Sequence, residues 1–84
     1  MLFISLMTAL PGKHSALIKK SKNPKIPEEI RIIRFLGMFG KPDNIAIFEA
    51  PNEEVCVDFL KQFLDVAEVS TFLAFSMENM KWSY

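Results

Sequence analysis

Residues 40–54 read GKPDNIAIFEAPNEE and contain, in order, a turn, a short apolar strand and the start of a helix. Residues 40–43 carry the Gly and Pro of the turn, and residues 44–50 are the predicted strand. Asn52 follows, and its side chain can accept a hydrogen bond from an unpaired backbone N–H group of a helix's first turn. Glu53 and Glu54 place negative charge where the helix dipole favours it. The stretch therefore predicts a hairpin that turns before residue 44 and a helix that begins after residue 52.

The flanking sequence supplies the other elements. After Asn52, apolar residues recur at helical spacing, and a strand follows at residues 69–77. Before the turn, residues 30–39 are predicted to form the hairpin partner of residues 44–50. A strand at residues 2–9 and a helix at residues 13–22 come first, ended by Pro11-Gly12 and Asn23-Pro24, respectively. The predicted helical stripe consists of Cys56, Phe59, Leu60, Phe63, Leu64 and Ala67.

The resulting order, β-α-β-β-α-β, predicts an α+β fold with a four-stranded antiparallel sheet and two helices on one face. With 84 residues the chain has room for one domain, assigned to residues 1–77. Residues 78–84 are predicted to be a C-terminal tail. Because the indole of Trp82 is costly to leave in water, this tail is a candidate arm that contacts a neighbouring subunit.

The strands are apolar on both faces. Half of the residues are hydrophobic, and in the predicted strand 44–50 Ile45 and Ile47 alternate with Ala46 and Phe48. Two helices can cover only one face of the sheet. We therefore expect the other face to pair with a second copy of the chain, in a homodimer or a higher oligomer.

Charge is balanced overall but segregated along the chain. Residues 13–34 hold seven Lys and Arg against two Glu, whereas residues 43–68 hold seven Asp and Glu against one Lys. Two interpretations are open: two solvated faces of opposite sign, or complementary patches that meet within an oligomer. The zero net charge argues against a generic binder of polyanions.

The segment from Gly40 to Glu54 resembles the GYD family of small prokaryotic proteins. That family has a Gly-x-Tyr-Asp turn, an apolar strand, Glu-Ala-Pro and an acidic helix start; here Pro42 stands in the place of the Tyr. Residues 71–76, TFLAFS, are also similar to the family's last strand. The resemblance implies a ferredoxin-like subunit that pairs sheet to sheet as a dimeric α+β barrel. Its superfamily includes ligand-binding regulatory modules and cofactor-free monooxygenases and isomerases.

Five residues are candidates for contact with a ligand: His14, Arg34, Phe39, Phe48 and Glu49. Glu49 ends an apolar strand beside the predicted hairpin partner that carries Arg34, so the two side chains can orient a polar ligand at the mouth of an apolar barrel. A cross-strand ion pair between Glu49 and Arg31 or Arg34 is the structural alternative. His14 is the only histidine and can equally be an ordinary residue of a helix face.

No constellation for metal or cofactor binding is visible, and we expect neither. Asp43 is interpreted as capping its own turn. Cys56 is the only cysteine and lies on the apolar stripe, which predicts a buried, unreactive thiol and a cytoplasmic protein without disulfides. Residues 2–10 are apolar, but they are too short to span a bilayer and are read as a buried strand.

Three functions remain open from the sequence. The first is a non-catalytic, homo-oligomeric module that binds a small apolar ligand or has a regulatory role. The second is a cofactor-free enzyme, similar to a monooxygenase or isomerase, that acts on an apolar or aromatic substrate with His14 and Glu49 as proton-handling groups. The third, an RNA-binding sheet surface, is opposed by the acidic Asp43 and Glu49 in residues 43–50, where such modules carry basic and aromatic residues.

Overall fold

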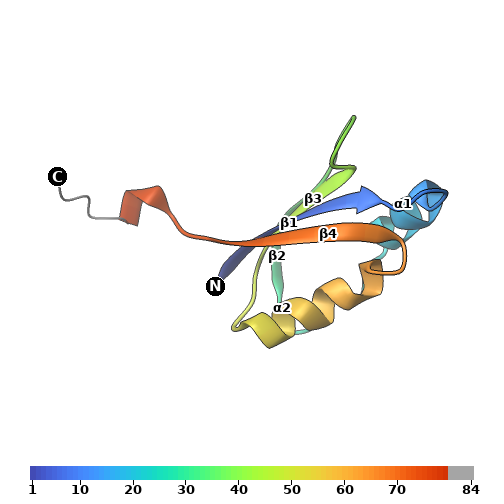
Figure 1. Ribbon diagram of the computed structural model, residues 1–84. Helices are drawn as coiled ribbons and strands as arrows, with labels where there is room; N and C mark the ends of the chain where they lie inside the picture. The colour runs from blue at the N-terminus through green and yellow to red at the C-terminus, as the bar shows by residue number, and fades with distance from the viewer. Residues whose placement is uncertain (80–84) are drawn as a thin grey trace.

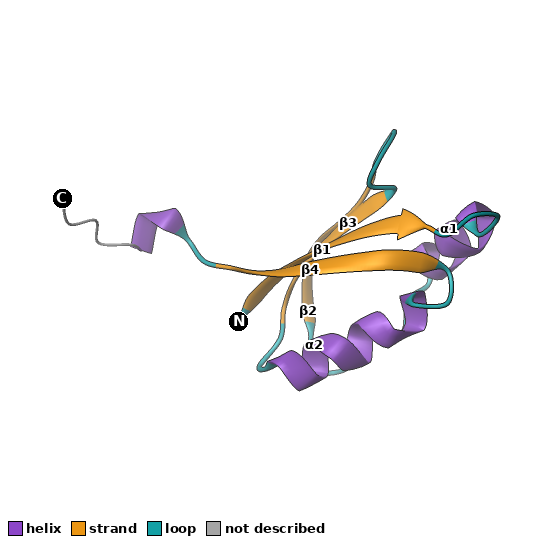
Figure 2. Ribbon diagram, in the orientation of Figure 1, coloured by secondary structure: helices purple, strands orange, loops and turns teal. Residues whose placement is uncertain are grey.

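The computed structural model describes residues 1–79 and shows the predicted order of elements, β-α-β-β-α-β. The neighbouring strands are all antiparallel, in the order β2-β3-β1-β4, so that β2 and β4 are the edge strands. Both helices lie on the same side of the sheet (Figure 1, Figure 2). The predicted α+β, ferredoxin-like arrangement is thus confirmed. The elements are β1 (Leu2–Ala9), α1 (His14–Lys22), β2 (Arg31–Gly37), β3 (Asn44–Glu49), α2 (Glu53–Leu60), the 3-10 turn η1 (Lys61–Phe63), β4 (Ala67–Ala74) and the 3-10 turn η2 (Met77–Asn79).

The hairpin between β2 and β3 closes as its sequence predicts. The backbone N–H of Met38 donates to the carbonyl oxygen of Asp43 at 2.9 Å. Gly40 lies in the turn with a φ of +114°, a conformation that side chains other than glycine's rarely adopt. At the other end of β3, Asn52 accepts a hydrogen bond from Val55 N at 2.9 Å and caps α2. The local signals of residues 40–54 therefore act where the sequence places them.

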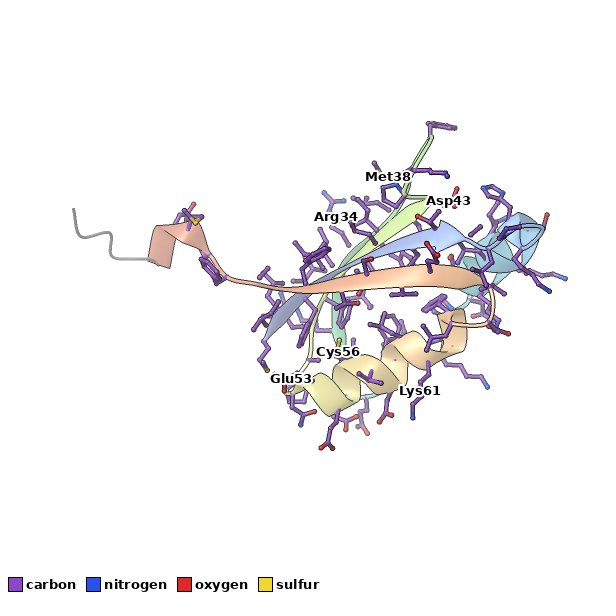
Figure 3. The ribbon with its side chains drawn as sticks, viewed as in Figure 1. Arg34, Met38, Asp43, Glu53, Cys56 and Lys61 are labelled. Carbon is purple, nitrogen blue, oxygen red and sulfur yellow. The ribbon has the colours of Figure 1, made fainter. Side chains whose placement is uncertain are left out.

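Alternation along β3 separates the two faces of the sheet. Asn44, Ala46 and Phe48 are buried towards the helices, while Ile45 and Ile47 lie on the opposite face and are partly exposed. We call this second face, which no described element covers, the open face. Figure 3 shows the same division: Cys56 lies between α2 and the sheet, and Arg34 lies on the side away from α2.

The core is built around a chain of aromatic rings. Phe3 stacks on Phe48 with ring centroids 5.7 Å apart, and Phe48 meets Phe59 edge to face at 5.1 Å. Phe59 continues to Phe63 at 5.9 Å, and Phe63 to Phe35 at 6.1 Å. Offset and edge-to-face contacts of this kind are the favoured geometries of phenyl rings. The chain joins β1, β3, α2, η1 and β2 into one hydrophobic core.

The region after α2 differs from the prediction. The helix ends at Leu60 and tightens into η1, and β4 begins at Ala67 instead of residue 69. Leu64, assigned to the buried stripe from its spacing, is 56% exposed. The cause is tertiary: Ala67 pairs with Ala9 and Leu2 with Ala74, so the length of β1 sets both ends of β4. Strand pairing overrides the helical pattern that continues through Ala67.

Some contacts between α1 and the segment after α2 pair residues of the basic segment 13–34 with residues of the acidic segment 43–68. Lys20 on α1 pairs with Asp65 at 2.7 Å and also donates to the carbonyl oxygen of Gln62 at 2.7 Å. Gln62 exchanges two hydrogen bonds with the backbone of Lys25, at 2.7 and 2.8 Å. Lys20 and Asp65 thus join residues 13–34 to residues 43–68 within the same chain, and Arg31 and Glu49 form a second pair between these segments. None of the helices described in residues 1–79 combines the length and the apolar character needed to cross a membrane.

Candidate functional site

Helix α1 packs loosely on the sheet and leaves a hollow beside β2 and β3. Its only buried residue is Leu17, and Lys13 provides no side-chain cap for its first turn. The inner hollow has a volume of about 260 Å³. It is lined by Leu17, Ile18, Ser21, Lys22, Phe35, Leu36, Gly37, Asp43 and Asn44.

A second hollow continues the first towards the β2–β3 turn. It has a volume of about 390 Å³ and is lined by His14, Ile18, Gly37, Met38, Phe39 and Asp43. Because Ile18, Gly37 and Asp43 line both hollows, the two form one depression, which we call the α1 groove. Figure 3 shows Met38 and Asp43 at the end of the sheet that lies next to α1. Two of the five predicted site residues, His14 and Phe39, therefore line the same groove.

The imidazole of His14 is held by Asp43. Nε2 of His14 lies 3.1 Å from Oδ1 of Asp43, whose other oxygen accepts a hydrogen bond from Ala9 N at 2.7 Å. The hydrogen bond from Ala9, more than the one from His14, lowers the pKa of the Asp43 carboxyl. The carboxylate thus joins the end of β1 to the start of α1, which differs from the predicted cap of its own turn.

Sequence reasoning missed this pair, although the predicted topology contains a signal for it. An antiparallel β1–β3 pair brings the start of β3 next to the end of β1, and α1 begins shortly after that end. A carboxylate just before β3 and a histidine at the start of α1 are therefore neighbours in this fold. The two residues are 29 positions apart in the chain, so no local pattern indicates the contact.

Asn44 is a further polar residue of the groove and is 6% exposed. Its Nδ2 donates to Oγ of Ser21 at 2.7 Å, and the Ser21 hydroxyl donates its proton to the Leu17 carbonyl oxygen at 2.7 Å. The Ser21 hydroxyl has one proton and donates it to the Leu17 carbonyl oxygen, so the hydroxyl can only accept a hydrogen bond from Asn44. The Asn44 atom next to the hydroxyl is therefore the amide nitrogen. Oδ1 of Asn44 is buried and has no hydrogen-bond partner among residues 1–79.

The remaining predicted site residues lie elsewhere. Arg34 is opposite Ile47 on the open face, and Glu49 pairs with Arg31, whose Nε lies 3.4 Å from Oε1. The cross-strand ion pair considered from the sequence therefore forms with Arg31. Phe48 is fully buried on the helix side of the sheet. His14 contacts Asp43 just before β3 begins, whereas Glu49 is the last residue of β3, so the structure does not bring His14 and Glu49 together as an acid–base pair.

Cys56 faces the core and is 4% exposed. Burial, with a smaller effect of Glu53, raises the pKa of its thiol above the ordinary value, which disfavours the reactive thiolate. The predicted unreactive thiol is consistent with this environment.

Within residues 1–79, no three His, Cys, Asp or Glu side chains come close enough to hold a metal ion.

The α1 groove is thus the place where this chain combines apolar walls with polar groups. Its walls come from α1 and β2, and its polar residues come from the start of β3 and from both ends of α1. Concave, mainly apolar sites with a few converging polar groups are typical of small-molecule binding. Neither protein-family models nor curated protein sequences match this chain.

Proposed function

We propose that this protein is a homo-oligomeric α+β-barrel module that pairs through the open face of its sheet and binds a small ligand without transforming it. The observation that carries the proposal is the composition of the open face. Its side chains are apolar at the centre, and no described element lies over them. Exposed apolar patches of this kind on small proteins are typical of interaction surfaces.

Strand register places the apolar side chains in rows across the sheet. One row runs from Ile47 through Ile4 to Phe72, and the next from Leu36 through Ile45 to Leu6. Phe72 is 55% exposed and Leu36 is 40% exposed. These rows form a continuous apolar surface over all four strands.

Polar residues surround those rows. The Arg31–Glu49 ion pair lies at one end of the open face, and Glu68 lies near the other, where it pairs in register with Thr8. Arg34 lies at the β2 edge, opposite Ile47. An apolar centre with a polar rim is the usual anatomy of a protein interface, and two sheets stack face to face about 10 Å apart. A second copy of the chain supplies the same apolar centre and polar rim.

Two further features support the proposal. Phe75 and Met77, just beyond β4, are 63% and 58% exposed, so apolar surface continues past the sheet towards the C-terminus. The resemblance of residues 40–54 to the GYD family implies the same sheet-to-sheet dimer, in a prokaryotic protein.

The lone, buried cysteine supports a cytoplasmic location. The predicted arm at Trp82 lies outside the described residues.

Light scattering on the purified protein tests the assembly. We expect a dimer or larger species for the intact chain and a folded monomer for Ile47→Asp, because the carboxylate enters the centre of the open face. Val57→Asp is the matched control: Val57 is 51% exposed on α2, so this variant should keep the size of the intact protein. A stable monomer at all concentrations of the intact chain would contradict the proposal.

The cofactor-free enzyme is the second candidate, favoured by the carboxylate-held imidazole of His14 at the mouth of the groove. A histidine positioned in this way can serve as a general base. Native mass spectrometry can identify a ligand that copurifies with the protein. If the protein converts that ligand to a product in solution and His14→Gln does not, the enzyme replaces the binding module as the function.

A further inference from the structure

We propose that residues 75–84, which we call the arm, cross to the partner subunit and insert the indole of Trp82 into the partner's α1 groove. The inference rests on the self-association part of the proposed function and gives that assembly a second contact. It assigns the α1 groove to the chain itself and leaves the space between the paired sheets for the small ligand.

The first part of the arm leaves its own subunit. Ala74 ends β4 opposite Leu2, and two exposed apolar residues, Phe75 and Met77, come next. Figure 1 shows this segment running away from the sheet at the end opposite α1. The groove of the same subunit lies at the other end of the sheet, where β1 ends and β3 begins. The arm therefore points away from its own groove.

The groove is continuous with the open face, over which the partner lies in the proposed assembly. Leu36 belongs to the apolar row that runs through Ile45 to Leu6, and it also lines the inner hollow. Because β2 is an edge strand, no other strand of residues 1–79 lies between the two surfaces. A segment of the partner can therefore pass round the β2 edge from the open face into the groove.

The arm has the length for this crossing. Stacked sheets lie about 10 Å apart, the three strand spacings from β4 to β2 cover about 14 Å, and the five residues from Leu2 to Met7 cover about 17 Å. With strand ends aligned, the partner's groove is therefore at most about 24 Å from the start of the arm. Trp82 is eight residues beyond Ala74 and reaches up to about 26 Å, whereas Phe75 and Met77 fall short.

The groove also fits an indole. Leu17, Ile18 and Phe35 line the inner hollow, whose volume is about 260 Å³. A cavity of about 150 Å³ is sufficient for benzene, so the hollow has room for the two rings of an indole. A buried indole N–H needs an acceptor, and the Asp43 carboxylate lines both hollows and has lone pairs beyond its two hydrogen bonds.

The fluorescence of the intact protein tests the inference, because Trp82 is the only tryptophan. In the dimer we expect emission at shorter wavelength and several-fold weaker quenching by acrylamide than in the monomeric Ile47→Asp. Pairing holds the arm close to the partner's groove, and the monomer has no such groove nearby. An intact dimer with Trp82 quenched as strongly as in Ile47→Asp would overturn the inference and leave the assembly standing.

Variants of the groove locate the indole. Gly37 pairs with Asn44, and a Cβ built on Gly37 meets no atom within 4 Å, so Gly37→Leu fills the groove without altering the open face. This variant and Ile18→Asp should still form dimers and should expose Trp82 to acrylamide. Val57→Leu places the same side chain on α2, outside the groove, and should leave the emission unchanged. A protected Trp82 in both groove variants would overturn the assignment.

A mixture of two variants tests whether the arm crosses between subunits. Trp82→Ser keeps the groove and lacks the fluorescent residue, whereas Gly37→Leu keeps the fluorescent residue and lacks the groove. In a mixed dimer the arm of Gly37→Leu meets the open groove of Trp82→Ser, so protection from acrylamide should return. Mixed dimers, identified by native mass spectrometry, without any return of protection would overturn the inference.

Light scattering on the same samples separates this inference from the assembly. Trp82→Ser should raise the dissociation constant of the dimer at least about tenfold, because a buried tryptophan anchor contributes strongly to an interface. An unchanged dissociation constant would overturn the inference and leave the sheet-to-sheet dimer standing. A monomeric intact chain with a protected Trp82 would overturn both, because the arm would then lie on its own subunit.

Discussion

Asp43 and Asn44 are neighbours in the chain, but their side chains make different contacts. The Asp43 carboxylate accepts hydrogen bonds from Ala9 N and His14 and so ties β1, α1 and β3 together at one end of the sheet. The Asn44 amide points to the helix side, bonds Ser21 on α1 and keeps an unpaired oxygen. The first residue links three elements of the fold, whereas the second holds a buried acceptor that has no partner among residues 1–79.

The lowered pKa of Asp43 makes stability depend on pH. The ionised carboxylate is favoured in the folded chain relative to the unfolded chain, where the pKa is near 3.8. Its contribution is therefore present above that value and is lost as pH falls through the folded-state pKa. We expect the melting temperature of the intact protein to fall on acidification below about pH 4, and Asp43→Asn to show a smaller fall.

Asp65, whose pKa is lowered by Lys20, acts in the same pH range and in the same direction. Asp65→Asn is therefore a second variant that should weaken the dependence on pH. Thermal melts followed by circular dichroism between neutral and acidic pH measure both effects. An Asp43→Asn variant with the full acid sensitivity of the intact protein would show that the Ala9 and His14 hydrogen bonds do not favour the ionised form.

Replacement of Asn44 by Leu removes the buried oxygen and keeps a side chain of the same branching and number of heavy atoms. A buried polar group without a partner costs about 1–3 kcal/mol, while the lost bond to Ser21 contributes about 1 kcal/mol. We expect the free energy of unfolding of Asn44→Leu to be unchanged or higher by up to about 2 kcal/mol. Urea denaturation measures it. A loss of more than about 2 kcal/mol would mean that Oδ1 is satisfied in the free protein.

At the scale of elements, the two helices have unequal roles. Helix α2 buries Cys56, Phe59 and Leu60 and joins the aromatic chain of the core. Helix α1 buries only Leu17 and is tied to the rest through polar contacts such as that between Lys20 and Asp65. Loose packing of α1 creates the groove, so the element with the smaller share of the core carries the candidate site.

Two phenylalanines from the predicted site differ in burial, and this difference provides a test. Phe48 is fully buried between Phe3 and Phe59, whereas Phe39 is fully exposed at the β2–β3 turn. Phe48→Ala should lower the free energy of unfolding by about 3–5 kcal/mol, through lost burial and a cavity. Phe39→Ala should change it by less than about 0.5 kcal/mol. Similar losses in urea denaturation of the two variants would contradict the assignment of Phe48 to the core.

At the scale of the whole molecule, one face of the sheet is covered and the other is open. Both helices lie on one side (Figure 2), and the rows around Ile4 and Ile47 lie on the other. A small domain gains much of its stability from apolar burial, and this chain leaves part of its apolar surface outside its own core. Association with a second copy would bury that surface.

Coupling between folding and association gives the last prediction. If folded chains pair through the open face, higher protein concentration stabilises the folded state by mass action. The melting temperature of the intact protein should therefore rise with concentration, and that of Ile47→Asp should not. Calorimetry over a wide concentration range measures this. A melting temperature of the intact chain that is independent of concentration would oppose pairing of the folded state.

The sequence by itself determined the elements and their order. Alternation in residues 44–49, the Asn52 cap and the glycine turn act over a few residues, so their consequences can be read locally. The apolar character of both sheet faces was also readable. Alternation does not say which face the helices cover, and for this reason the sequence predicts Phe48 in the site although the residue belongs to the core.

Only the tertiary structure decided where the polar atoms meet and where space is left. The contact between His14 and Asp43 and that between Asn44 and Ser21 depend on strand pairing and on the position of α1 over the sheet. The end of α2 likewise depends on the length of β1, with which β4 pairs. These features arise from packing between segments distant in sequence, and such packing follows from the free energy of the whole fold and not from any local pattern.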